Sequence, residues 1–140
     1  MAMIDADTHL REGYFLDEVY KLSGEFAKFT PKRVKDGAYH EIEFEFDLEP
    51  WGHEVEKYGG HRQLYAPDRQ GGRIAQLQPG GYDKDQRIAD LASAGVGKQV
   101  LFCTGSAIPT LNEGPLGLAL CQSFNDWVAG FVKGYEDKLY

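Results

Sequence analysis

Apolar and polar residues alternate most regularly over residues 40–47. There Ile42, Phe44 and Phe46 share one side and three glutamates share the other. This pattern predicts a strand with one buried and one solvated face, as in an antiparallel hairpin. Residues 96–102 form a nearly continuous apolar run instead, which is typical of a parallel strand that is buried on both faces.

Three other segments carry apolar residues at three- and four-residue steps, which predicts helices. These segments are residues 12–27, 83–94 and 115–133. Asp83 can cap the second helix, and Gly95 can end it. The order of elements therefore predicts an α/β protein in which helices alternate with parallel strands.

The first predicted strand, residues 3–9, ends in a polar pattern that suggests chemistry. Asp7 and His9 are two residues apart, so their side chains point to the same side of a strand, with Asp5 one step deeper on that face. A carboxylate and an imidazole are suitable ligands for Zn, Mn or Fe. The alternative is a polar strand end that binds nothing, because two ligands do not fill a site that needs three or four.

Three segments of the chain, in order, are similar to one family of enzymes. Residues 4–12 contain Asp7-Thr8-His9, residues 82–102 contain an Arg-hydrophobic-x-Asp helix followed by Ala-Gly-Val, and residues 124–127 read Phe-Asn-Asp-Trp. Together they resemble the amidohydrolase superfamily, in particular its branch of aminocarboxymuconate-semialdehyde decarboxylase-like enzymes. The superfamily usually has His-x-His on its first strand, and some members of this branch have an acid in place of the first histidine.

The resemblance implies a fold, a domain organisation and a function. The fold would be the N-terminal part of a TIM-type (β/α)8 barrel with a small antiparallel β insertion. Residues 1–140 would be a single partial barrel domain, with a cap-like insertion at about 30–81. The activity would be metal-dependent hydrolysis or non-oxidative decarboxylation of a small carboxylated or cyclic substrate. Asp7 and His9 would bind the divalent metal.

Arg11 is a further candidate in this pattern. An arginine makes bidentate contacts to carboxylates, so Arg11 could pair with a substrate carboxylate. A salt bridge at the rim, to Glu12 or another acid, explains Arg11 equally well.

The length limits what the chain can do. A (β/α)8 barrel needs about 250 residues, and this chain has 140. A further metal-binding histidine, a catalytic histidine and a late-strand aspartate of the family have no counterpart here. The chain is therefore expected to be a fragment, a truncated gene product or one of two subunits. The alternative function is a non-catalytic fragment or an interaction subunit, either an oligomer or completed by a missing C-terminal part.

Charge and composition limit the classes of partner that the chain is expected to bind. A formal net charge of -7 argues against nucleic acids and anionic membrane surfaces. No apolar run reaches the length of a membrane span, and no signal peptide is visible. The two cysteines, Cys103 and Cys121, form no metal-binding or redox motif, which favours a cytoplasmic protein. A small-molecule substrate as partner is what the resemblance implies.

Two other regions hold weaker candidates. Cys103 and Thr104 follow the second predicted parallel strand, at the edge where barrel enzymes place their chemistry. The irregular segment 48–81 could contribute substrate contacts from a cap, although a surface loop role is the more common one for such residues. Its polar and aromatic candidates are Trp51, His53, His61, Arg62, Arg69 and Arg73.

Overall fold

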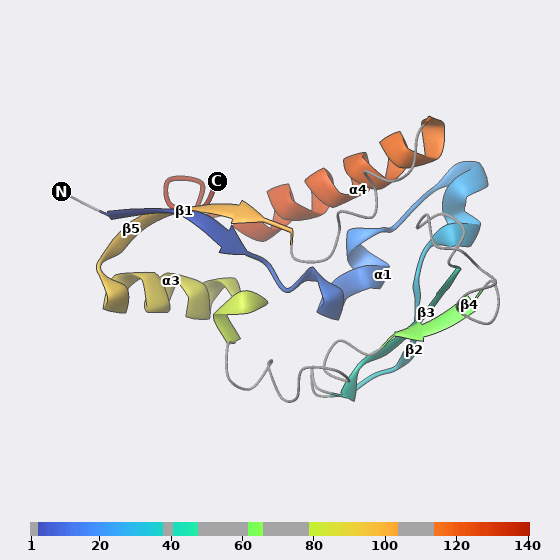
Figure 1. The fold of residues 1–140 in the computed structure, drawn as a ribbon, viewed down its shortest axis with the longest axis horizontal. Coiled ribbons are helices and arrows are strands. Elements are labelled where there is room, and N and C mark those ends of the chain that lie inside the picture. The colour runs from blue at the N-terminus through green and yellow to red at the C-terminus, as the bar shows by residue number, and fades with distance from the viewer. Residues whose placement is uncertain (1–2, 38–40, 48–61, 66–78, 104–113) are drawn as a thin grey trace.

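The computed structural model of the chain describes residues 3–37, 41–47, 62–65, 79–103 and 114–140. Within these residues the strands form two separate sheets, one parallel and one antiparallel. In Figure 1 helix α3 lies below the parallel pair, helix α4 extends from the right-hand end of this pair toward the upper right, and the antiparallel sheet lies at the end of the molecule opposite the N-terminus.

The parallel sheet pairs β1 (Met3–His9) with β5 (Val96–Phe102). The last residues of the chain continue it, because Gln99 and Leu139 form a parallel bridge on the other side of β5. The Gln99 N–H donates to the carbonyl oxygen of Lys138 at 2.8 Å, and the Tyr140 N–H donates to the carbonyl oxygen of Gln99 at 2.9 Å. Within this sheet the order in space is β1, then β5, then the C-terminal residues, which is also their order in the sequence.

The antiparallel sheet confirms the strand predicted from the alternating pattern. Its order is β2 (Lys32–Lys35), β3 (Glu43–Asp47) and β4 (Arg62–Tyr65). Ile42 and Phe44 are 3% and 0% exposed, so the apolar side of the alternation is the buried side. Strand β4 lies within the segment expected to be irregular, so that expectation was wrong for these four residues.

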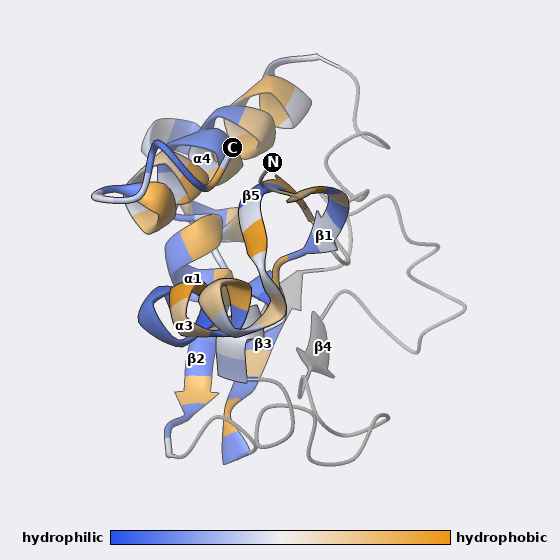
Figure 2. Ribbon diagram, turned by 90° about the vertical axis from the view of Figure 1, so that its left-hand side faces the viewer, coloured by the Kyte–Doolittle hydropathy of each residue, from blue (hydrophilic) through white to orange (hydrophobic). Residues whose placement is uncertain are grey.

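Helices α3 (Lys84–Ala94) and α4 (Pro115–Val132) match two of the predicted helices. Asp83 caps α3, because its carboxylate accepts hydrogen bonds from the N–H groups of Asp85 and Gln86. Gly95 ends α3 at a φ of 70°, a left-handed conformation that glycine adopts without strain. Figure 2 shows apolar and polar bands alternating along α4, as expected for a helix with one buried side.

The helix predicted over residues 12–27 is broken into short pieces. A 3-10 helix (Glu12–Phe15) is followed by α1 (Leu16–Val19) and a second 3-10 helix (Gly24–Phe29). After α1 the Leu22 N–H donates to the Thr30 hydroxyl at 3.0 Å and to the Tyr20 carbonyl oxygen at 2.9 Å, and neither acceptor is the carbonyl four residues back that a helix would use. A tertiary side-chain contact therefore replaces the helical bond that the spacing predicts.

The core forms where α1 meets α4. Val19, Tyr20, Leu22 and Leu120 are buried together. The partly buried aromatic side chains that pack against this cluster include Phe15, Phe124 and Trp127. These contacts fix α4 by its apolar stripe, as its spacing predicts.

The fold class is therefore mixed α/β, with parallel and antiparallel strands, and no closed barrel forms among the described residues. Strand β5 differs from its prediction, because Gln99 is its one buried residue and Phe102 is 47% exposed. Helix α3 covers one face of the β1–β5 pair. On the other face Ile4, Phe102 and Tyr140 remain exposed, at 61%, 47% and 52%.

Leu120→Ala tests the core. Removing this fully buried side chain leaves a cavity, so we expect the free energy of unfolding to fall by about 2–5 kcal/mol. Leu118→Ala on the same helix is the matched control, since Leu118 is 60% exposed and the change is expected to be within about 0.5 kcal/mol. Urea unfolding followed by circular dichroism measures both. Equal losses in the two variants would contradict the packing described.

Candidate functional site

Strand β1 carries a β-bulge immediately before its polar end. Asp5 lies opposite Gln99 and Thr8 lies opposite Leu101, so β1 spends three residues where β5 spends two. One extra residue in β1 breaks the alternation of its side chains. Asp5 and Thr8 therefore share one side of the strand, where the Thr8 hydroxyl reaches the Asp5 carboxylate.

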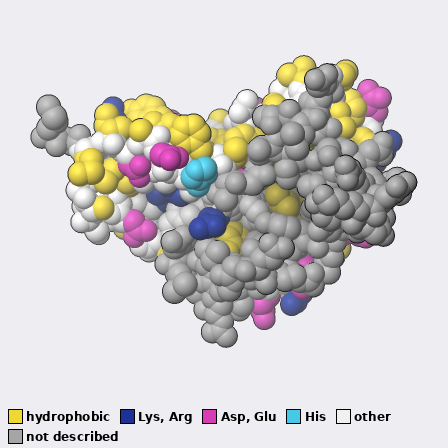
Figure 3. Space-filling view, viewed as in Figure 1, with side chains coloured by type: hydrophobic (Ala, Val, Ile, Leu, Met, Phe, Trp, Pro, Cys, Tyr) yellow, Lys and Arg dark blue, Asp and Glu magenta, His cyan; other side chains and the backbone are white. Residues whose placement is uncertain are grey.

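Asp7 and His9 meet on the surface beyond this bulge. His9 Nε2 lies 3.5 Å from Asp7 Oδ1, and the two side chains are 53% and 85% exposed. The two-residue spacing predicts this meeting. The prediction that Asp5 would share their face was wrong, because the bulge turns the Asp5 side chain toward Gln99 instead. In Figure 3 a histidine surface, cyan, adjoins acidic side chains in magenta on the face shown.

The His9 ring has a defined hydrogen-bonding state. Its Nδ1 lies 2.7 Å from the backbone carbonyl oxygen of Cys103. A carbonyl oxygen can only accept, so Nδ1 carries the hydrogen and donates it. In the neutral ring Nε2 then has a free lone pair, and this atom faces Asp7.

The Asp5 carboxylate accepts three hydrogen bonds. The donors are the Thr8 hydroxyl at 2.5 Å, the Gln99 side-chain amide at 3.0 Å and the Asp7 N–H at 3.3 Å. These bonds favour the charged carboxylate, and they lower the pKa of Asp5, with the Thr8 bond as the largest cause. Asp5 is therefore a partly buried carboxylate that is bonded to Thr8, to Gln99 and to the backbone of Asp7.

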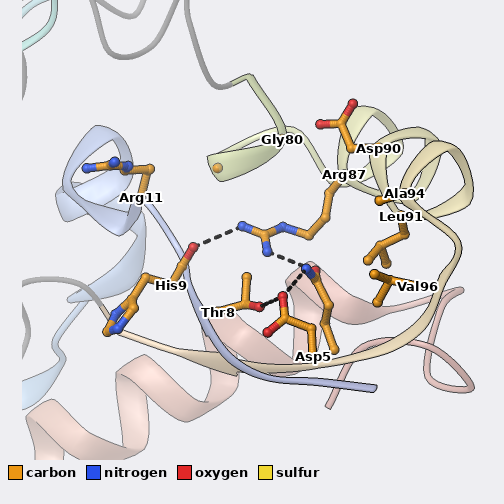
Figure 4. Close-up of a pocket in the computed structure, with 12 residues that line it drawn as sticks. Asp5, Thr8, His9, Arg11, Gly80, Arg87, Asp90, Leu91, Ala94 and Val96 are labelled. Atoms are coloured by element: carbon orange, nitrogen blue, oxygen red, sulfur yellow. Dashed lines mark hydrogen bonds between the residues drawn. The ribbon is translucent and has the colours of Figure 1, made fainter. Parts of the chain in front are cut away.

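Arg87 of α3 completes this network and is 5% exposed. Its guanidinium donates to Gln99 Oε1 at 3.1 Å and to the backbone carbonyl oxygen of His9 at 3.0 Å, as Figure 4 shows. Burial lowers the pKa of Arg87, and the negative charges of Asp5 and Asp90 oppose this effect. Helix α3 is thus joined to both parallel strands through one side chain.

A pocket of about 400 Å³ opens between α3 and the two parallel strands. Its lining carries positive charge from Arg11 and Arg87, negative charge from Asp5 and Asp90, and apolar surface from Leu91, Ala94 and Val96. A volume of this order suits a small organic molecule.

The turn before α3 closes one side of this pocket. A Cβ atom on Gly81 would lie 2.5 Å from Cγ of Arg11, and one on Gly80 would lie 2.6 Å from the Asp90 carboxylate and 3.2 Å from the Arg87 Cα. The Arg11 N–H also donates to the Gly81 carbonyl oxygen at 2.8 Å. Gly81 therefore allows this turn to approach Arg11 at the end of β1 closely, and Gly80 allows it to pack closely against α3.

The other predicted candidates have different outcomes. Cys103 contributes its backbone carbonyl to His9. For Arg62 the structure describes only the backbone, in β4. The candidates that lie outside the described residues are Thr104, Trp51, His53, His61, Arg69 and Arg73.

Sequence reasoning missed Arg87 and Gln99. A helix over residues 83–94 that buries its apolar side chains would turn Ile88, Leu91 and Ala92 inward, whereas the buried residues of this helix are Arg87 and Leu91. The four-residue spacing of Arg87 and Leu91 was a usable signal, as was a glutamine within a mostly apolar strand.

The described part of the chain holds no group of three or more His, Cys, Asp or Glu residues arranged to bind a metal ion. Likewise, none of its helices combines the length and apolar character needed to cross a bilayer.

Gly80→Ala tests the close approach at the pocket. The new methyl group would contact the α3 backbone, so we expect a loss of about 1–3 kcal/mol in the free energy of unfolding. Gly130→Ala is the matched control, because that position in α4 has open space around it and alanine favours a helix by about 0.5–1 kcal/mol. Thermal unfolding of both variants measures the difference, and a Gly80→Ala protein as stable as Gly130→Ala would refute the contact.

Comparison with known proteins adds no relative to this geometry. The chain matches no protein-family model, no curated protein and no solved structure. The resemblance to the amidohydrolase superfamily thus stays a prediction that rests on the three sequence segments.

Proposed function

We propose that the chain is the N-terminal part of a metal-dependent, amidohydrolase-like enzyme of the TIM-barrel type. The observation that carries the proposal is the Asp7–His9 pair at the carboxyl end of β1. The carboxyl ends of parallel strands are where barrel enzymes bind substrate and metal. The reaction would be hydrolysis or non-oxidative decarboxylation of a small carboxylated or cyclic substrate.

The geometry of the pair fits a divalent ion. Two ligand atoms about 2.1 Å from one ion, at a tetrahedral angle, are about 3.4 Å apart. His9 Nε2 and Asp7 Oδ1 are 3.5 Å apart. The Nδ1 hydrogen bond to the Cys103 carbonyl supports the same role, because metal-binding histidines almost always donate their second ring N–H to an acceptor. Zn, Mn and Fe are all compatible with these ligands.

Each residue of the site would have a separate task. A divalent ion held by Asp7 and His9 supplies Lewis acidity to a substrate oxygen. Arg11 lines the neighbouring pocket, where a guanidinium can bind and orient a substrate carboxylate. The remaining ligands and the general base must come from groups other than these three residues, since two ligands bind an ion only weakly.

The strand order supports the barrel part of the proposal. Strand β1 pairs with β5, and β5 is bridged on its other side by Leu139, all in parallel. In a (β/α)8 barrel each strand lies beside the next one in the sequence, with a helix between them. In the order of the chain, α3 precedes β5, and α4 follows β5 before Leu139.

A second candidate function is a non-catalytic fragment or an interaction subunit that is completed by another chain. It is favoured by the exposed face of the β1–β5 pair, which carries Ile4 and Phe102. Parallel sheets are normally covered on both faces, so this face is suited to association with further protein. Monomeric behaviour in light scattering would argue against this candidate.

Metal analysis tests the proposed ligands. We expect the 140-residue chain to bind a divalent metal ion at best weakly, and we expect Asp7→Ala and His9→Ala each to reduce bound metal by at least tenfold, because each removes one of two ligands. Elemental analysis after dialysis against Zn²⁺ measures the stoichiometry.

Asp126→Ala is the control for this experiment, since Asp126 is an exposed acid on α4, remote from β1 in the sequence. Metal content that is the same in all four proteins would refute the ligand assignment.

Turnover by the 140-residue chain tests the second candidate function. We expect no hydrolase or decarboxylase activity from this chain alone, because a general base contributes about a hundredfold or more to rate and the described residues supply no third metal ligand. Activity that disappears with a chelator and with His9→Ala would overturn this expectation and remove the second candidate.

A further inference from the structure

The bulge at the Asp7–His9 end of β1 is held by the side chain of Asp5. One carboxylate oxygen of Asp5 accepts the Asp7 N–H, and the other accepts the Thr8 hydroxyl. Such local bonds from an aspartate to the backbone that follows it compete with the regular strand ladder. They occupy the position where β1 gains its extra residue.

A second set of bonds holds Asp5 and the far end of the same segment. Gln99 donates to Asp5 and accepts from Arg87, and Arg87 donates to the backbone carbonyl oxygen of His9. The bonds thus form a closed circuit from β1 through β5 and α3 and back to β1. This circuit holds the backbone on both sides of Asp7, before it at Asp5 and after it at His9.

Stability alone is a weak explanation for this arrangement. A buried charged network is frequently no more stabilising than well-packed apolar residues of similar volume. Arg87 is 5% exposed, and its Nε is buried without a hydrogen-bond partner among the described residues, which is a further cost. The circuit does fix the path of the backbone, because each of its hydrogen bonds forms only when donor and acceptor lie at the right distance and angle.

We propose that Asp5, Gln99 and Arg87 are positioning residues that hold Asp7 and His9 in their metal-binding arrangement. The circuit maintains the bulge and keeps the His9 carbonyl in place, so that the His9 ring stays within reach of the Cys103 carbonyl in its Nδ1–H form. This inference rests on the proposed function, since it assigns a purpose to the geometry of that pair. Groups that orient metal ligands in this way commonly contribute 10- to 100-fold to metal affinity.

Two variants test the inference: Thr8→Val removes the hydrogen bond that holds Asp5 at the bulge, and Gln99→Met breaks the circuit. Each replaces a hydrogen-bonding side chain by an apolar one of similar size, and neither changes Asp7 or His9. Arg33→Lys and Ser123→Ala are the controls. They disrupt hydrogen bonds of the same kind elsewhere, to Asp17 and to the Val19 carbonyl oxygen. All four are made in the 140-residue chain.

Two measurements are made on every variant. The first is Zn²⁺ affinity by calorimetric titration. The second is the ¹⁵N chemical shift of the His9 ring in metal-free protein at about pH 8, where an ordinary histidine is neutral. This shift reports which ring nitrogen carries the hydrogen, and it does not depend on metal binding.

We expect Thr8→Val and Gln99→Met to weaken Zn²⁺ binding by about 10- to 100-fold and to mix the two His9 tautomers. The controls should retain the affinity and the Nδ1–H form of the unmodified protein. Unchanged affinity and unchanged tautomer in both circuit variants would overturn the inference, as would equal losses in the controls.

If the unmodified chain binds no Zn²⁺, the proposed function fails and the tautomer measurement alone decides the positioning role. Should Gln99→Met fail to fold, Thr8→Val still decides it, since valine is well suited to a strand.

Discussion

A buried guanidinium joins the parallel strands to the helix that covers them. Arg87 of α3 reaches β1 at the His9 carbonyl and β5 at Gln99, and Gln99 passes the contact on to Asp5. A buried charge is costly unless it is paired and hydrogen-bonded. Here the neutral side-chain amide of Gln99 lies between the Arg87 guanidinium and the Asp5 carboxylate and bonds to both. The position of α3 and the register of the two strands therefore depend on the same few hydrogen bonds.

This constraint decides how the end of β1 presents its side chains. With regular alternation, Asp5, Asp7 and His9 would all point the same way. Because of the bulge, the Asp5 side chain points toward Gln99, whereas Asp7 and His9 point toward solvent. Bulges are frequent beside active sites because they turn a side chain without moving the whole strand. Asp7 and His9 are therefore held in place by Asp5 and Thr8, whose side chains lie on the other side of the same strand.

The antiparallel sheet is attached by a comparable device. Arg33 of β2 makes two hydrogen bonds to the Asp17 carboxylate in α1, at 2.9 and 3.0 Å, and lies over the Phe44 ring at 5.1 Å. A planar guanidinium can make both kinds of contact at once, which lysine cannot. In both sheets an arginine joins a strand to a helix, and apolar packing between α1 and α4 supplies the surrounding core.

Local patterns in the sequence determined much of this protein. Alternation predicted the strand around Phe44, three- and four-residue steps predicted α3 and α4, and the two-residue spacing predicted that Asp7 and His9 meet. These features depend on near neighbours, whose geometry follows from regular backbone periods. The bulge, the roles of Arg87 and Gln99 and the broken helix after β1 were decided only by the tertiary structure. Each depends on hydrogen bonds between residues distant in the sequence or on a departure from the regular period, and periodicity contains no information about either.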